Sequence, residues 1–96
     1  MAVAMSEVNG DELVAAHRHC RGQRSELVAS TVCGCFYCKE TFVPSEIADW
    51  CDDGETALCP KCGVDSVLAS ESGWPVTDAA FLEAMHRFWF QNVTTR

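Results

Sequence analysis

Two closely spaced pairs of cysteines constrain this sequence more than any other feature. Cys35 and Cys38 are separated by two residues, Cys59 and Cys62 repeat that spacing, and 20 residues lie between the pairs. A two-residue gap lets a tight turn direct both thiols toward one ion, and two such turns supply the four thiolates that Zn²⁺ accepts in a tetrahedral site. The spacing therefore predicts one structural zinc ion bound by Cys35, Cys38, Cys59 and Cys62.

The chain is short for a self-supporting hydrophobic core. Its 96 residues suffice for one small domain, whose core alone leaves it marginally stable. A structural metal ion supplies much of the missing folding free energy in such domains. Four protein ligands leave no open coordination position for water or substrate, so the predicted ion is structural and not catalytic. The sequence also lacks a Gly-rich phosphate loop and the H-E-x-x-H and G-x-S-x-G motifs, and we expect no enzymatic activity.

Three of the seven cysteines lie outside the two pairs. Cys33 competes as a ligand through its spacing from Cys38, although a buried hairpin cysteine or a thiol placed behind the metal ligands is the favoured interpretation. Cys51 is interpreted as a small core residue. Cys20 is the only spare thiol among basic residues, which lower a thiol pKa. It is the best candidate for a reactive cysteine, with an inert, partly buried thiol as the favoured alternative.

The first part of the chain predicts short helices followed by a hairpin. Residues 10–30 carry a helical apolar pattern that breaks at Gly22, which indicates one or two short helices. Residues 31–43 are rich in aromatic and β-branched residues around Gly34, which predicts a short β-hairpin bent by its cysteines.

The middle of the chain predicts a helix and a second hairpin. Ser45 is an expected N-cap, Asp53 and Gly54 end the predicted helix, and its apolar face comprises Ile47, Trp50 and Cys51. Residues 56–58 and 64–69 are predicted to form two short strands of one hairpin around the second cysteine pair.

A last helix is predicted from Thr77 and Asp78 to about Gln91. Its apolar residues form a stripe at helical spacing that we expect to pack as core; they are Phe81, Leu82, Met85, Phe88 and Trp89. Phe90 falls off this stripe, so an exposed aromatic edge is expected near Trp89 and Phe90, of the kind that marks a partner surface.

Together these elements predict a small α+β fold. Zinc-ribbon-like β-hairpins carry the two C-x2-C turns, a helix is inserted between the turns, and N- and C-terminal helices flank the core. We expect one domain over residues 1–96. It consists of an N-terminal helical segment (1–30), a zinc-ribbon core (31–70) and a C-terminal helix that packs on the core (71–96).

The net charge of −7 is unevenly distributed. Between residues 40 and 83, Lys61 is the only basic residue, against ten acidic ones: Glu40, Glu46, Asp49, Asp52, Asp53, Glu55, Asp65, Glu71, Asp78 and Glu83. Four thiolates on a dication would add about −2 to this balance. Such a surface repels phosphate backbones, so another protein is the expected partner and nucleic acid is disfavoured.

One basic cluster stands against this balance. It comprises His17, Arg18, His19, Arg21 and Arg24, whose arginines recur at three-residue spacing and would share one flank of a helix. A solvated helix face is the favoured interpretation, and contact with a phosphate or an acidic partner is the alternative.

The chain carries no sign of secretion or membrane insertion. Residues 1–7 have no basic residue ahead of their short apolar stretch, unlike a secretory signal. No apolar run approaches the roughly 20 residues of a membrane span. We therefore expect a cytoplasmic protein without membrane contact, where a reducing environment disfavours disulfides.

Several motifs occur in one order between Val32 and Phe90: C-G-C-F-Y-C, A-L-C-P-K-C-G, D-S-V, S-G-W-P-V-T and F-L-E-A-M-H-R-F-W-F. In this order they resemble a group of small, uncharacterised bacterial cytoplasmic proteins with a zinc-ribbon-like core. The resemblance covers about two thirds of the chain. It implies a bacterial, cytosolic, zinc-binding domain and no reaction. The segment from Arg18 to Arg24 is weakly matched.

The leading functional hypothesis is a non-enzymatic zinc domain that binds another protein as an interaction or adaptor module. The alternative is a thiol-based redox or zinc-release switch, in which oxidation of a C-x2-C pair ejects the metal. A nucleic-acid-binding ribbon ranks third, because the net charge opposes it. A zinc hydrolase is disfavoured because it requires a histidine ligand or an open coordination position.

Overall fold

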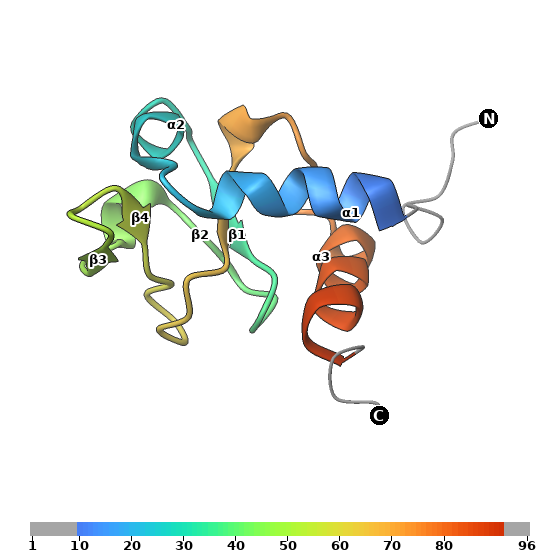
Figure 1. Cartoon of the computed structure of the whole chain (residues 1–96). Helices are drawn as coiled ribbons and strands as arrows, with labels where there is room; N and C mark the ends of the chain where they lie inside the picture. Colours follow the sequence, from blue (N-terminus) through green and yellow to red (C-terminus); the bar gives the residue numbers. More distant parts are fainter. Residues whose placement is uncertain (1–9, 92–96) are drawn as a thin grey trace.

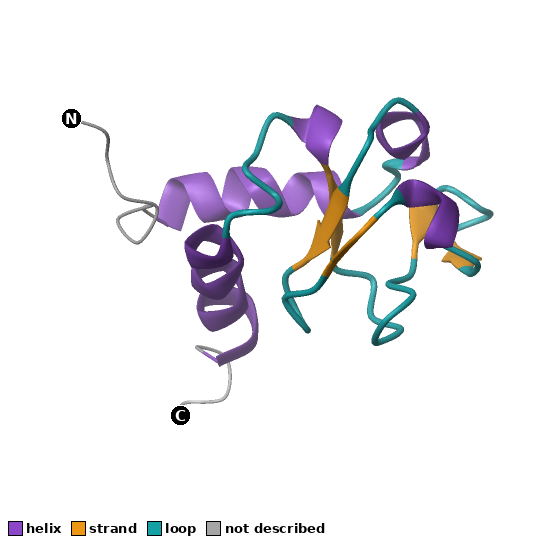
Figure 2. Ribbon diagram, turned by 180° about the vertical axis from the view of Figure 1, so that it is seen from behind, coloured by secondary structure: helices purple, strands orange, loops and turns teal. Residues whose placement is uncertain are grey.

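The computed structural model describes residues 10–91, so the prediction about a leader at residues 1–7 lies outside the described part. It is a small α+β fold of three α-helices and short antiparallel strands. The helices are α1 (Gly10–His17), α2 (Arg24–Val28) and α3 (Ala79–His86). The strands are β1 (Cys33–Cys35), β2 (Thr41–Phe42), β3 (Trp50–Cys51), β4 (Thr56–Ala57) and β5 (Val67–Ala69). Helices α1 and α3 gather at one end of the molecule, and α2 lies with the β3–β4 hairpin at the other end (Figures 1 and 2).

The strands form two antiparallel sheets. The larger has the order β2-β1-β5, in which Cys33 pairs with Phe42 and Cys35 pairs with Val67. The smaller joins β3 to β4. The predicted hairpin in residues 31–43 is confirmed by the β1–β2 pairing, and the predicted N-terminal helices are confirmed by α1 and α2.

The second predicted hairpin is wrong, because β4 and β5 pair with other strands. The side chain of Gln23 lies between them: its amide nitrogen donates to the Val67 carbonyl (2.8 Å), and the Ala57 amide donates to its Oε1 (3.3 Å). Gln23 is buried, so these hydrogen bonds satisfy polar groups that water cannot reach. A side chain that is distant in sequence therefore takes the place of a direct β4–β5 pairing.

The predicted helix between the two cysteine pairs is also wrong. Pro44–Glu46 forms a single 3₁₀ turn, and the chain is extended again at Ile47. Trp50 and Cys51 then form β3, which pairs with β4. Ser45 does not cap a helix; the Glu46 carboxylate instead accepts a hydrogen bond from the Val43 amide (3.1 Å).

The reason for this error is tertiary packing. Ile47 and Trp50 both pack against a buried cluster that contains the cysteines, which extended chain achieves as well as a helix does. A tight turn then closes the β3–β4 hairpin, with positive φ at Asp52 (52°), Asp53 (58°) and Gly54 (85°). Pairing with β4 therefore overrides the local helical spacing.

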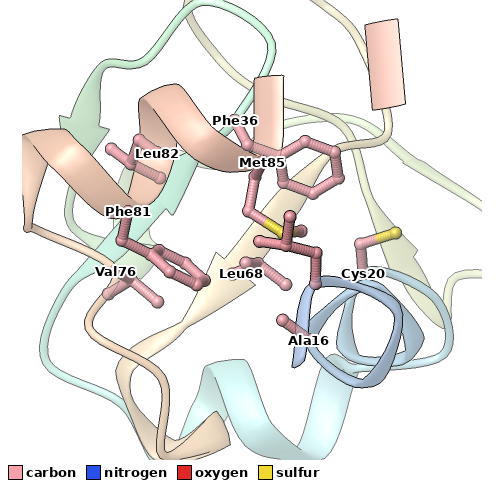
Figure 3. Close-up of a cluster of buried hydrophobic side chains, with 9 residues drawn as sticks. Ala16, Cys20, Phe36, Leu68, Val76, Phe81, Leu82 and Met85 are labelled. Carbon is pink, nitrogen blue, oxygen red and sulfur yellow. The ribbon is translucent and has the colours of Figure 1, made fainter. Parts of the chain in front are cut away.

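Helix α3 forms as predicted. Its N-cap Asp78 accepts hydrogen bonds from the amides of Ala80 (2.7 Å) and Phe81 (3.2 Å). Its buried face packs with α1 and the sheet in a core cluster (Figure 3) made of Leu13, Ala16, Cys20, Phe36, Leu68, Val76, Phe81, Leu82 and Met85. The first part of the predicted stripe is therefore core, while Phe88 and Trp89 are only partly buried against it.

The helix ends in a π-helical turn, Arg87–Gln91, which changes the expected aromatic edge. Phe90 packs on the rings of Phe36 (5.8 Å between centroids) and Tyr37 (4.9 Å), and Trp89 stacks on His17 (3.8 Å). Both are half-buried, so the aromatic edge expected at these two residues is only partly exposed. A π turn holds an extra residue, which carries Phe90 toward the first cysteine turn.

Candidate metal centre

The first C-x2-C pair forms a tight turn that continues from β1. The Lys39 amide donates to the Cys35 carbonyl (2.8 Å), the Cys35 amide donates to the Glu40 carbonyl (3.0 Å), and the Tyr37 amide donates to Cys35 Sγ (3.4 Å). Lys39 has a φ of 65°, in the left-handed region that closes such a turn.

The second pair repeats this geometry 24 residues later. The Gly63 amide donates to the Cys59 carbonyl (2.8 Å), the Cys59 amide donates to the Val64 carbonyl (3.0 Å), and the Lys61 amide donates to Cys59 Sγ (3.3 Å). Gly63 has a φ of 83° at the position equivalent to Lys39. The two turns thus have one design, in which the first thiol of each pair accepts a backbone hydrogen bond.

The two turns bring four sulfur atoms together. The Sγ atoms of Cys35, Cys38, Cys59 and Cys62 all lie within 4.8 Å of one another. Sulfurs of opposite turns are 3.7 Å apart for Cys35 and Cys62 and 3.8 Å apart for Cys38 and Cys59. A tetrahedron with Zn–S bonds of about 2.3 Å has sulfur–sulfur edges of about 3.8 Å. The donor set therefore fits one metal ion of the size of zinc.

The four thiols differ in their surroundings. Cys35 and Cys59 are buried, whereas Cys38 and Cys62 are half-buried. Burial raises the pKa of Cys62 to about 11 and also raises that of Cys38. Burial likewise opposes ionisation of Cys35, but hydrogen bonds from Ser66 and the turn backbone outweigh it, and its pKa is lowered. A bound dication lowers the pKa of every ligand thiol, so metal binding releases protons.

Ser66 also belongs to this centre, although no sequence motif predicted a role for it. It is buried directly before β5, and its hydroxyl lies 3.1 Å from Cys35 Sγ. Hydrogen bonds to ligand atoms hold them in position and tune their basicity. The register of β5 against β1, with Cys35 opposite Val67, places Ser66 at this point.

A lysine of each turn is paired with a carboxylate from another element. Lys39 Nζ lies 2.8 Å from Glu83 on α3, and Lys61 Nζ lies 3.1 Å from Glu46 of the 3₁₀ turn. The pairing with Lys39 and Arg87 lowers the pKa of Glu83 to about 2. These pairs are solvent-exposed and contribute little stability.

The other cysteines lie outside the group of four sulfurs. Cys33 is buried in β1, and burial raises its pKa to about 12. Cys51 is half-buried in β3, and desolvation followed by the charge of Asp52 raises its pKa.

Cys20 matches the favoured interpretation of an inert thiol and not the alternative of a reactive one. It is buried, and its pKa rises to about 11, chiefly through burial and then through the charge of Asp65. Arg21 lowers this pKa, but its effect is smaller than the other two. Desolvation therefore outweighs the basic residues, and the thiol stays protonated at neutral pH.

The basic cluster does not share one helix flank. The chain passes from a 3₁₀ turn, Arg18–Cys20, through Gly22 with a φ of 60°, to α2, so the three arginines do not lie on one continuous helix. Arg24 donates to the Gly54 carbonyl (2.6 Å) and stacks over the Trp50 ring at 4.5 Å. His19 pairs with Glu26 at 2.8 Å. Part of the cluster thus holds α2 to the β3–β4 hairpin.

Comparison with known proteins does not assign this chain to a family. The sequence matches no protein-family model, no curated protein and no solved structure at a significant level. The four-cysteine cluster supports the metal-binding part of the resemblance to zinc-ribbon-like proteins, and a bacterial origin stays a prediction. Among the helices of residues 10–91, none has the length and apolar character required to cross a bilayer.

Proposed function

We propose that the protein is a structural zinc domain of zinc-ribbon-like type, in which Cys35, Cys38, Cys59 and Cys62 bind one Zn²⁺. The observation that carries this proposal is the convergence of four sulfurs from two equivalent turns within 4.8 Å, with the 3.7 and 3.8 Å distances between the turns at the edge length of a zinc tetrahedron. When bound, the ion links the end of β1 to the turn that precedes β5. It thereby stabilises a core too small to be strongly stable alone.

A structural role without catalysis follows from the ligand set. Four protein thiolates complete a tetrahedral zinc site and leave no position for water or substrate. Backbone amides and the Ser66 hydroxyl also form hydrogen bonds with the sulfur atoms of Cys35 and Cys59. We therefore propose a non-enzymatic, cytoplasmic module, since a reducing compartment keeps such thiols free for metal.

The proposed activity of this module is binding of another protein through the first cysteine turn. Tyr37, between two of the ligands, exposes 43% of its surface although it packs on Phe90 and His86. Tyrosine in such a rigid, half-packed position is typical of interaction hot spots. The net charge of −7 favours a protein with a basic face over nucleic acid.

Replacement of Tyr37 tests this surface. Wild-type protein, Tyr37→Ala and Val28→Ala are immobilised in zinc-loaded form and exposed to extract of the source cells. Val28 is the matched control, because it is an exposed apolar residue (78%) on α2. We expect wild type and Val28→Ala to retain the same partner protein. That partner should bind Tyr37→Ala at least about tenfold more weakly, as expected for loss of a hot-spot residue. Equal retention by all three baits would contradict the assignment.

A thiol-based zinc-release switch is the second candidate. The sulfurs of opposite turns lie 3.7 and 3.8 Å apart, and one member of each of these pairs is half-buried at the surface. A peroxide that reaches the surface thiols would take two electrons from each pair, forming one disulfide and releasing water, and the metal would lose its ligands. The observation that favours this candidate is the surface position of Cys38 and Cys62.

Native mass spectrometry separates the two candidates. Protein purified under reducing conditions is measured natively and after denaturation, with and without mild peroxide. We expect one zinc per chain in the native spectrum and its loss on denaturation, and an apoprotein would contradict the zinc domain. Zinc that persists under peroxide until other residues are oxidised supports the structural module alone. Release of zinc together with the mass loss of new disulfides, reversed by reductant, supports the switch.

A further inference from the structure

A cavity of about 330 Å³ opens beside the metal centre, with which it shares Ser66, and its remaining wall takes no part in the proposed zinc site. Four segments that are distant in sequence form it: the end of α1 with the following turn, the first cysteine turn, the residues after the second cysteine turn, and the C-terminal π turn. Its wall includes His17, Arg21, Phe36, Asp65, Trp89 and Phe90. Its size falls at the lower end of the range for small-molecule sites.

One wall of the cavity is aromatic and is fixed by packing. Trp89 stacks on the His17 ring at 3.8 Å and donates its indole N–H to the Leu13 carbonyl (3.3 Å). Phe90 packs against Phe36, which is almost fully buried. Trp89 and Phe90 both belong to the π turn Arg87–Gln91. Such turns occur frequently at functional sites.

The rest of the wall carries two opposite charges that do not pair with each other. Arg21 and Asp65 are exposed, and within residues 10–91 neither side chain has a hydrogen bond or an ion pair. The His17 ring also lacks a hydrogen-bond partner in this range, and its pKa is lowered by burial and by Arg21, which favours the neutral ring. The cavity therefore offers a cationic donor, an anionic acceptor and an apolar wall, with no net charge.

We propose that this cavity binds the zwitterion of a small α-amino acid with an apolar side chain. Arg21 pairs with the α-carboxylate, Asp65 accepts hydrogen bonds from the α-ammonium group, and the side chain lies on Phe90 and Trp89. A monovalent anion would pair with Arg21 and be repelled by Asp65, and a monovalent cation would pair with Asp65 and be repelled by Arg21. A zwitterion satisfies both, and its side chain covers aromatic surface that the fold leaves open.

Binding is measured on the reduced, zinc-loaded protein with L-phenylalanine and L-leucine. Two analogues each lack one charge: 2-phenylethylamine has no carboxylate, and 3-phenylpropionate has no ammonium group. Isothermal calorimetry gives affinities, and the Trp89 indole N–H signal in two-dimensional NMR locates the site. We expect at least one of the amino acids to bind with a dissociation constant on the order of 0.1 mM, as suits a ligand of this size. Both analogues should bind about tenfold more weakly, because each loses one charged hydrogen-bonding partner.

Variants assign each charge to its partner. Asp65→Asn should weaken amino-acid binding about tenfold, but it should not weaken binding of 3-phenylpropionate, because it removes a like charge. Arg21→Gln should also weaken amino-acid binding about tenfold, and it should not weaken binding of 2-phenylethylamine. Asp49→Asn and Arg18→Gln are matched exposed controls outside the cavity wall and should bind like wild type.

Several outcomes would overturn the proposal. The first is no change in the Trp89 signal at amino-acid concentrations of about 10 mM, which is far above the expected dissociation constant. The second is equal binding of the amino acids and their analogues. The third is an equal loss of affinity in the control variants. All of these measurements are made on protein whose zinc content has first been established. A failure here is therefore distinguishable from failure of the zinc proposal, which the native mass spectrum reports separately.

Discussion

Serine in place of Cys59 is expected to leave the chain without a stable fold at ordinary zinc concentrations. Cys59 is one of the four cysteines whose sulfurs converge. It is buried in a cluster made of Leu27, Cys33, Cys35, Phe42, Ala57, Cys59, Val67 and Ala69. Structural zinc sites contribute about 10–16 kcal/mol of apparent binding free energy, much of which is lost with one ligand. A small domain has only about 5–15 kcal/mol of total stability. Loss of NMR dispersion and of a cooperative thermal transition are the measurements that report this.

Cys51→Ser is the matched control for this prediction. Cys51 lies outside the group of four sulfurs and is half-buried in β3. Removal of its thiol should change the free energy of unfolding by less than about 1 kcal/mol, as for most substitutions away from special contacts. If Cys59→Ser kept the wild-type spectrum and denaturation midpoint, or if Cys51→Ser unfolded equally, the metal would not be what stabilises the core.

Gly34→Ala is expected to have the second largest effect. Gly34 lies in β1 between Cys33 and Cys35, and a Cβ atom there would overlap the carbonyl group of Val76 and crowd Leu82. The obstacle is backbone, so it cannot turn aside as a flexible side chain does. We expect a loss of about 3 kcal/mol or more in the free energy of unfolding, toward the upper range of overpacking effects.

Gly10→Ala provides the control for Gly34→Ala. Its added Cβ atom would lie 3.5 Å from the Phe88 ring, an ordinary contact, at the first residue of α1. At the first residue of a helix the preference between glycine and alanine is small, so we expect a change of less than about 1 kcal/mol in either direction. Denaturant titrations of both variants with saturating zinc compare them directly. A Gly34→Ala midpoint equal to that of wild type would show that β1 and the Val76 segment separate easily.

The cysteine spacing predicted the grouping of the four thiols because it reports a local geometry. A C-x2-C turn needs only its own residues and a left-handed position after the second cysteine, which Gly63 signals directly. Lys39 adopts the same conformation without a sequence signal. The N-cap of α3 at Asp78 was predictable for the same reason, since its two hydrogen bonds lie within three residues.

Strand pairing in the middle of the chain could not be predicted, because it depends on distant residues. The strands involved are two or three residues long and carry little pattern of their own. Gln23 lies between β4 and β5 in place of direct pairing of these strands, and it is 34 and 44 residues away from its hydrogen-bond partners in the sequence. The spacing of Ile47, Trp50 and Cys51 suits a helix, yet the same side chains reach the cluster from extended chain. Nothing local distinguishes these outcomes.

The cavity beside the metal centre had no sequence signal either. Its charged residues, Arg21 and Asp65, are 44 residues apart in the sequence. The sequence pattern placed Arg21 on a solvated basic helix face and Asp65 on an acidic surface. The π turn at Arg87–Gln91 brings the aromatic wall to them. Helical periodicity assigned Trp89 to the core and Phe90 to solvent, because it assumes a regular 3.6-residue turn.

X-ray absorption spectroscopy at the zinc edge tests the central claim most directly, because it reports the ligand atoms themselves. Protein expressed with zinc and purified under reducing conditions is measured in solution. We expect one shell of four sulfur atoms at about 2.3 Å and no nitrogen or oxygen ligand. A shell that requires nitrogen or oxygen at about 2.0 Å would contradict a closed centre of four cysteines. An absence of bound zinc would contradict the structural metal site altogether.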